Sequence, residues 1–143
     1  MQITTINQNN IDSVYQISLA EFTQESWTHS QFLDAINNNN YLCLCACEDC
    51  VYSYCLALNS LDDINILSIA TANEHKNKGY AKMLIEYIKN LATSQNKTVS
   101  LEVKETNTKA LSLYQKMGFK VVSKRANYYK DGTTALIMFF NLN

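Results

Sequence analysis

Residues 64–92 read INILSIATANEHKNKGYAKMLIEYIKNLA and carry the clearest structural signal in the chain. The isoleucine-rich segment 64–71 predicts a strand. Apolar residues then recur at helical spacing, which predicts a long amphipathic helix that begins near Lys78. The residues that form this apolar face are Ala81, Leu84, Ile85, Ile88, Leu91 and Ala92. The polar segment 74–82 therefore lies between a strand and the N-terminus of a helix.

This polar segment has the character of an anion site. Lys76, Lys78 and Lys82 crowd a helix N-terminus, where the macrodipole is already positive and cations are unfavourable. A bound anion would reverse that penalty, and backbone N–H groups at a helix start bind phosphate readily. Gly79 is one of only three glycines in the chain and would let a ligand approach the backbone closely. These features favour a phosphate loop over a solvated lysine cluster, although neither the Walker pattern nor the three-glycine dinucleotide pattern is present.

The rest of the chain alternates strand and helix patterns. Strands are predicted near 3–6, 41–47, 51–58, 99–103, 119–122 and 135–140, and helices over 11–19, 29–37 and 108–117. Asn10 is expected to cap the first helix, and Thr28 with Gln31 forms a capping box for the second. Gly118 stands where a left-handed residue ends a helix. The order β-α-α-β-β-β-α-β-α-β-β predicts one mixed α/β domain over residues 1–143.

Composition and charge narrow the class of protein. The chain has 143 residues, a typical length for one domain. Its 12 basic and 13 acidic residues give a net charge of −1, which offers no basic field for nucleic acid or a membrane surface. No apolar run is long enough to span a membrane, and the first residues lack the features of a secretory signal. We therefore expect a cytoplasmic globular protein with no direct nucleic-acid or membrane partner.

Five cysteines, at positions 43, 45, 47, 50 and 55, fall within one short stretch. A metal site would need a second cluster or a histidine pair, and the sequence supplies neither. Disulfides conflict with a cytosolic location. Segment 41–47 instead predicts a buried strand in which cysteine packs as a small hydrophobe, so we expect no metal.

Three further residues could carry chemistry. Glu102 shares the polar side of strand 99–103 with Ser100, whereas a central strand is usually apolar on both faces. A carboxylate there lies either at a cleft or on an exposed face, and exposure is the commoner case. Tyr114 falls in the apolar stripe of helix 108–117, which is more typical of a core residue than of a catalyst. Asn107 is expected to cap that helix.

Taken together, these segments resemble a known family. Lys76-Asn77-Lys78-Gly79-Tyr80-Ala81 resembles the pyrophosphate loop of the GNAT superfamily of acetyl-CoA-dependent N-acetyltransferases, whose pattern is Gln/Arg-x-x-Gly-x-Gly/Ala. Leu101-Glu102-Val103, Asn107, Tyr114 and Met117-Gly118-Phe119 resemble the strand and helix that follow that loop. The resemblance implies a GNAT fold, with a central mixed, mostly antiparallel twisted sheet of about seven strands and helices on both faces.

Two other segments are similar to the RimI-type subgroup. They are Asn127-Tyr128-Tyr129, before the final hairpin strand, and Ser26-Trp27-Thr28, similar to a Pro-Trp-Ser segment near the substrate groove. That subgroup acetylates protein N-termini, and its namesake acts on a ribosomal protein. The resemblance thus implies acetyl-CoA as cosubstrate and a protein N-terminus, including that of a ribosomal protein, as acceptor.

The resemblance also implies a role for each site residue. Backbone groups of Ile69, Ala70 and Thr71 would hold the pantetheine arm, with Asn107 beside it. The amides of Lys76, Asn77, Lys78, Gly79, Tyr80 and Ala81 would cradle the pyrophosphate. Glu102 would accept a proton from the amine, directly or through water, and Tyr114 would protonate the departing thiolate. Trp27 and Tyr128 would line the acceptor groove.

Two other functions stay open from the sequence alone. One is a GNAT enzyme that acetylates a small amine, such as a polyamine or an antibiotic. The other is a non-catalytic module that binds acyl-CoA without turnover. The presence of both Glu102 and Tyr114 argues against loss of catalysis.

Overall fold

The computed structural model describes residues 2–141, and its elements follow the predicted order. The strands are β1 (Gln2–Thr5), β2 (Tyr41–Cys47), β3 (Val51–Asn59), β4 (Asp63–Thr71), β5 (Thr98–Lys104), β6 (Lys120–Arg125) and β7 (Ala135–Phe140). The α-helices are α1 (Ile11–Phe22), α2 (His29–Ile36), α3 (Tyr80–Ser94) and α4 (Thr108–Lys116). Two short 3₁₀ turns, η1 (Thr23–Glu25) and η2 (Asn73–His75), complete the order.

The seven strands follow the order β1-β2-β3-β4-β5-β7-β6. The pairs β1–β2, β2–β3, β5–β7 and β6–β7 are antiparallel. Strands β4 and β5 run parallel, with Asp63–Ile66 opposite Thr98–Leu101. The predicted seven-stranded, mixed and mostly antiparallel sheet, flanked by helices, is therefore confirmed.

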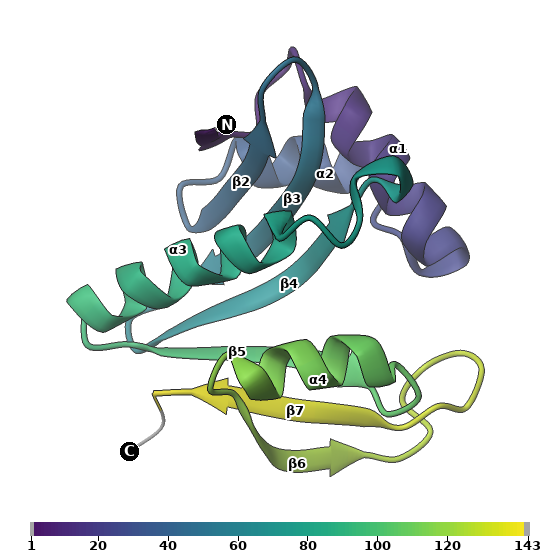
Figure 1. Ribbon diagram of the computed structural model, residues 1–143, viewed down its shortest axis with the longest axis vertical. Helices are drawn as coiled ribbons and strands as arrows, with labels where there is room; N and C mark the ends of the chain where they lie inside the picture. The colour runs from purple at the N-terminus through teal and green to yellow at the C-terminus, as the bar shows by residue number, and fades with distance from the viewer. Residues whose placement is uncertain (1, 142–143) are drawn as a thin grey trace. The chain divides into compact units, whose positions relative to one another are not determined.

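Contacts between Cα atoms divide the chain into two compact units. The first comprises residues 2–59 and Leu67–Tyr87, and the second comprises Ser60–Ile66 and residues 88–141. In the first unit, α1 packs on α2 and β3, and α2 packs on β2 (Figure 1). The core there is formed by Ile6, Ile11, Val14, Ile17, Phe32, Ala35, Cys43, Cys45, Val51, Tyr54, Leu56 and Ala70.

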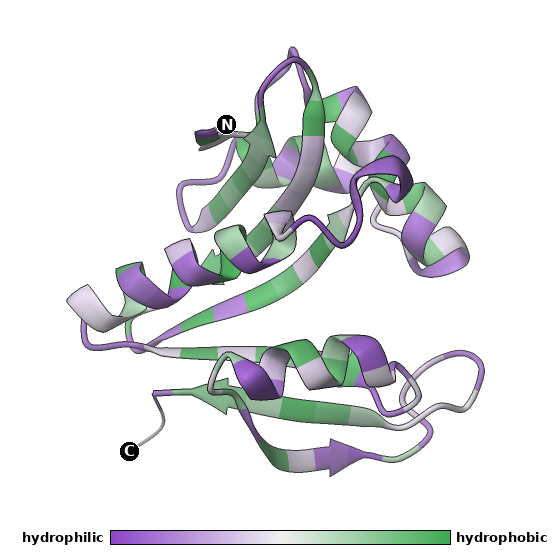
Figure 2. Ribbon diagram, in the orientation of Figure 1, coloured by the Kyte–Doolittle hydropathy of each residue, from purple (hydrophilic) through white to green (hydrophobic). Residues whose placement is uncertain are grey.

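The second unit is built on the β5–β7–β6 ladder. Strand β7 is mostly hydrophobic, whereas β6 ends in hydrophilic residues (Figure 2). This contrast matches burial, since Ala135, Leu136 and Met138 of β7 are buried and every residue of β6 is exposed. The hydroxyls of Thr98 and Ser100 both donate to the Asp63 carboxylate at 2.6 Å, which fastens the start of β4 to β5.

The cysteine stretch packs as predicted. Cys43 and Cys45 on β2 and Cys55 on β3 are buried, whereas Cys50 in the hairpin turn is exposed. Burial raises the pKa of Cys43 to about 11 and that of Cys45 and Cys55 to about 12. These three thiols stay protonated at neutral pH, so they behave as small apolar side chains.

Two local predictions have different outcomes. The Thr28 capping box is confirmed, with the Gln31 N–H donating to Thr28 Oγ1 at 3.1 Å and the Thr28 N–H donating to Gln31 Oε1 at 2.8 Å. The side-chain cap predicted for Asn10 is wrong. Asn10 Oδ1 instead accepts from the Asn7 N–H at 2.8 Å, because a short amide side chain competes for nearby turn groups.

Candidate active site

The predicted phosphate loop, between η2 and α3 in the first unit, has an unusual backbone. Asn77 and Gly79 both have positive φ, +66° and +86°, so the helix begins at Tyr80, two residues after Lys78. A Cβ built on Gly79 would meet no heavy atom within 4 Å. Glycine is therefore required here by backbone conformation and not by packing, and the backbone borders open space at a helix N-terminus. This arrangement fits an anion cradle.

One of the three lysines at this loop has a carboxylate partner. Lys76 Nζ lies 2.7 Å from Glu21 Oε2 of α1, and each side chain is 34% exposed. Lys78 and Lys82 are exposed. The positive charge available to an anion at the loop therefore comes from Lys78, Lys82 and the helix N-terminus.

The end of β4 leads into this loop. The Ala72 N–H donates to the Tyr52 carbonyl at 2.9 Å, and Ser53 Oγ donates to the Ala70 carbonyl at 2.8 Å. The backbone groups of Ala70 thus face β3. Because neighbouring residues of a strand direct these groups to opposite sides, those of Ile69 and Thr71 face away from β3. This alternation suits Ile69 and Thr71, more than Ala70, for contacts with a ligand arm.

Glu102 lies on β5 in the second unit. It is opposite Ile137 of β7, and its side chain is 33% exposed. Arg125 Nη1, from the end of β6, lies 3.4 Å from Glu102 Oε1. Ser100, on the same side of β5, is buried and donates to Asp63. The Glu102 carboxylate is therefore partly exposed and in contact with a guanidinium.

Tyr114 is buried near the end of α4, and its backbone is held firmly. The N–H of Phe119 donates to the Tyr114 carbonyl at 3.0 Å, and the N–H of Gly118 donates to the Gln115 carbonyl at 3.1 Å. With φ of +96° at Gly118, these two bonds form a Schellman motif, which confirms the predicted helix end. The Tyr114 ring packs on the Phe119 ring at 5.8 Å between centroids.

Asn107 begins the same helix. Its Oδ1 accepts the Ala110 N–H at 3.2 Å, so the predicted N-cap is confirmed. The cap uses the amide oxygen, and the amide nitrogen takes no part in it. Asn107 can therefore cap α4 and also donate to a ligand.

The two predicted acceptor-groove residues differ in their surroundings. Trp27, in the first unit, packs its ring on Phe32 at 5.7 Å and on Tyr41 at 6.4 Å, beside the core. Tyr128, in the β6–β7 loop of the second unit, is 48% exposed and lies over Arg125 at 5.4 Å. Arg125, which lies against the Tyr128 ring, also contacts Glu102. Tyr128 and Glu102 therefore share one contacting residue.

The loop that carries Tyr128 is anchored next to it. The Asp131 carboxylate accepts from the Thr133 N–H at 2.9 Å and from Lys104 Nζ at 3.2 Å. Hydrogen bonds from Thr133, with a smaller contribution from Lys104, lower the pKa of Asp131 to about 2. Lys104 also lies over the Tyr129 ring, 5.0 Å from its centroid. These contacts fasten the loop to the end of β5.

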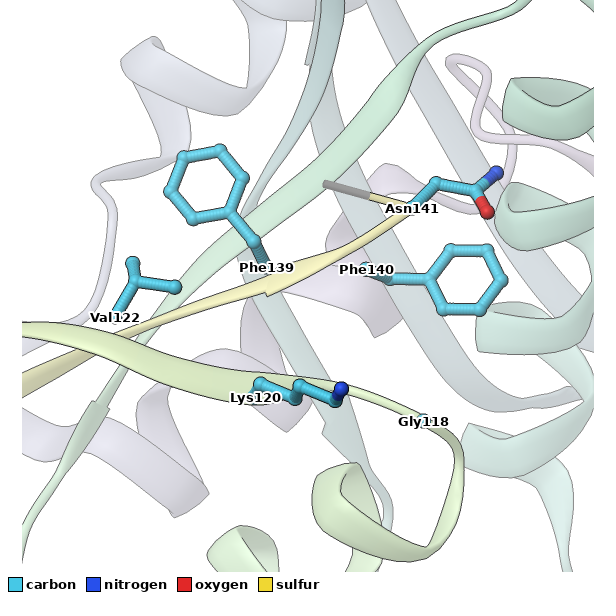
Figure 3. A pocket seen from close by; sticks show the side chains of 6 residues that line it. All are labelled: Gly118, Lys120, Val122, Phe139, Phe140 and Asn141. Carbon is cyan, nitrogen blue, oxygen red and sulfur yellow. The ribbon is translucent and has the colours of Figure 1, made fainter. Parts of the chain in front are cut away.

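A pocket elsewhere in the second unit does not involve the candidate residues. It has a volume of about 250 Å³ and is lined by Gly118, Lys120, Val122, Phe139, Phe140 and Asn141 (Figure 3). None of these is a predicted site residue.

Over residues 2–141, no cluster of three histidine, cysteine, aspartate or glutamate side chains is arranged to hold a metal ion. In the same part of the chain no helix combines the length and apolarity needed to cross a membrane.

Comparisons with known proteins identify the family of the chain. A family model described as Acetyltransferase (GNAT) family matches residues 11–119. A Bacillus subtilis (strain 168) protein, provisionally named ribosomal protein bS18-alanine N-acetyltransferase, is 30% identical over 99% of this chain and 95% of its own length.

Two solved structures are similar in fold. The crystal structure of the ribosomal-protein-S18-alanine N-acetyltransferase from Escherichia coli has a TM-score of 0.87 at 24% identity, covering 97% of this chain and 92% of that one. The crystal structure of Ard1 from Thermoplasma volcanium has a TM-score of 0.85 at 26% identity, covering 96% and 95%. The resemblance inferred from the motifs is confirmed, and the chain belongs to the GNAT acetyltransferase family.

Proposed function

We propose that the chain transfers the acetyl group of acetyl-CoA to the N-terminal amine of a protein, as RimI-type enzymes do. The observation that carries this proposal is the similarity to the Bacillus subtilis protein, which extends over 99% of the chain. That similarity runs beyond the family-model match, which ends at residue 119, and so includes the β6–β7 loop with Tyr128. The relative's name specifies the alanine of a ribosomal protein, and we propose a ribosomal protein N-terminus as the acceptor.

The first unit supplies the groups for binding acetyl-CoA. The backbone of Ile69 and Thr71 would receive the pantetheine arm, and the loop 76–81 would receive the pyrophosphate. The positive φ of Asn77 and Gly79 and the open space at Gly79 support this assignment. By the resemblance, Asn107 would also bind acetyl-CoA, and its amide nitrogen takes no part in the helix cap.

The proposed reaction is a direct acyl transfer. Glu102 accepts a proton from the amine, directly or through a water molecule, and the nitrogen attacks the thioester carbonyl carbon. The C–N bond forms, the C–S bond breaks, and Tyr114 donates its phenolic proton to the departing thiolate. An α-amine has a reference pKa of about 7.7–8.0, so one carboxylate suffices as the base near neutral pH. Tyrosine, with a reference pKa of about 10, starts the cycle protonated.

No covalent enzyme intermediate is required, because the amine attacks the thioester itself. The buried cysteines are accordingly left out of the mechanism, in agreement with their raised pKa values. We further propose that residues 1–143 act as one domain. The cytoplasmic location and the absence of nucleic-acid or membrane partners stay predictions.

Mass spectrometry of acetyl-CoA turnover against a peptide panel tests the proposal. The panel varies the first residue and includes lysine-containing peptides with a blocked N-terminus and polyamines. Transfer to free peptide N-termini is the expected result, and alanine-first peptides derived from ribosomal proteins are expected to be among the best acceptors. Transfer confined to polyamines or other small amines would replace the proposed acceptor. Binding of acetyl-CoA without any transfer would indicate a non-catalytic module.

A further inference from the structure

Arg125 is the only arginine in the chain, and its side chain contacts two proposed site residues of the second unit. Its Nη1 lies 3.4 Å from Glu102 Oε1, and its guanidinium carbon lies 5.4 Å from the centroid of the Tyr128 ring. The Tyr128 ring in turn meets the Tyr129 ring edge-on, with 5.2 Å between centroids and an interplanar angle of 86°. One guanidinium thus connects the proposed base on β5 with the proposed acceptor loop.

The strand register explains why arginine, and not its neighbour Lys124, has this position. Strand β7 lies between β5 and β6, and Ile137 is opposite both Glu102 and Ser123. A bulge between Val121 and Ser123 shifts the register of β6 by one residue. Because side chains alternate between the two faces of a sheet, this shift places Arg125 on the same face as Glu102.

Lys124 consequently lies on the opposite face. Its Nζ pairs with Glu105 Oε2 at 3.5 Å instead of with Glu102. The residue opposite Arg125 on β7 is Ala135, which is small and buried, so the long arginine side chain can lean across it toward Glu102. Lys104, the cation on β5 that shares this face, contacts Asp131 and the Tyr129 ring.

We infer that Arg125 is a positioning residue that orients the Glu102 carboxylate and couples it to Tyr128. This inference rests on the proposed function, in which Glu102 accepts the proton of the acceptor amine. The contact distance of 3.4 Å is longer than that of a tight charge-assisted hydrogen bond, about 2.7–2.9 Å. A carboxylate offers about four lone-pair sites, so this single contact leaves capacity for the amine proton.

The Tyr128 ring completes the coupling. Cation–π attraction holds the guanidinium against the ring face and restricts the conformations of a flexible side chain. When an acceptor peptide settles against Tyr128, the ring, the guanidinium and the carboxylate are held together. Lysine could supply the charge but not the planar guanidinium that lies over the ring.

Steady-state acetylation of a peptide by Arg125→Ala, with Lys124→Ala as a matched control, tests the inference. The control removes a neighbouring cation of the same strand whose partner is Glu105. We expect kcat of Arg125→Ala to fall about 10- to 100-fold, since misplacing a reacting group costs rate, while the Kd for acetyl-CoA stays unchanged. The Lys124→Ala variant should keep kcat close to the wild-type value. Added guanidinium ion should restore part of the kcat of Arg125→Ala, and Arg125→Lys should be intermediate.

Three results would overturn the inference. They are a kcat for Arg125→Ala equal to that of Lys124→Ala, a loss that added guanidinium does not restore, and a parallel loss of acetyl-CoA affinity. Failure of the proposed function would be seen separately, because the wild-type enzyme would then transfer no acetyl group to any peptide. Should Arg125→Ala fail to fold, the kcat of Arg125→Lys is compared with that of Lys124→Ala instead, since lysine keeps the charge but lacks the guanidinium that contacts both Glu102 and Tyr128.

Discussion

Replacing Gly79 with alanine has two effects that can be measured separately, one on the stability of the fold and one on the binding of acetyl-CoA. Gly79 has φ of +86°, a conformation that costs an L-residue about 1–2 kcal/mol. The new Cβ would meet no heavy atom within 4 Å, so steric clash adds nothing in the absence of ligand. For a chain of this length 1 kcal/mol corresponds to roughly 3 °C in Tm, and we expect Tm to fall by about 3–6 °C.

The loss of binding free energy for acetyl-CoA should be larger than the loss of folding stability. If the loop amides hold the pyrophosphate, the Cβ enters the space that the phosphate oxygens need. Loss of one hydrogen bond to a charged group removes about 1.5–3 kcal/mol, which weakens acetyl-CoA binding about 10- to 150-fold. Gly79→Val, which adds β-branching at a positive φ, should abolish measurable binding.

Isothermal titration calorimetry with acetyl-CoA measures this effect, and Gly132→Ala provides the matched control. Gly132 has nearly the same φ, +85°, and a Cβ there would lie 3.9 Å from Asn127 Oδ1. The two alanine variants should therefore lose similar stability, while only Gly79→Ala loses affinity. Equal affinities for Gly79→Ala and Gly132→Ala would refute the assignment of the loop as the phosphate site.

Three further predictions concern side chains. Tyr114→Phe should lower kcat about 100-fold or more without changing acetyl-CoA affinity, and unchanged turnover would remove Tyr114 from the acid role. Glu102→Gln should alter the pH dependence of kcat/KM, so an unaltered profile would mean that another group is the base. Burial raises the pKa of Cys45 to about 12, so a thiol reagent at pH 8 should label exposed Cys50 well before Cys45. Equally fast labelling of both in the folded protein would contradict the described packing.

The regular elements could be predicted because local patterns determine them. The apolar spacing of 81–92 and the Thr28 capping box specify helices without reference to distant residues. Predictions were less accurate where backbone conformation departs from the pattern. The start of α3 shifted to Tyr80 because Asn77 and Gly79 take positive φ, and the Asn10 cap failed because its amide bonds to Asn7.

The candidate site was predicted where a motif is contiguous in the chain. Gly79 could be identified because glycine is scarce in this chain and because this glycine directly precedes a helix. Contacts between distant residues could not be found this way, since Glu21 and Lys76 are 55 positions apart. The pairing of Arg125 with Glu102 depends on the β6 bulge, and a single sequence does not reveal where a strand gains an extra residue.

The acetylation site on one peptide that carries both a free N-terminal amine and an internal lysine shows most directly whether the protein is an N-terminal acetyltransferase. Tandem mass spectrometry of the product, with the Glu102→Gln/Tyr114→Phe double variant as a control for uncatalysed reaction, locates the acetyl group. We expect enzyme-dependent acetylation of the N-terminal nitrogen, with the lysine side chain unmodified. Acetylation of the lysine alone, or equal product from the enzyme and the double variant, would contradict this expectation.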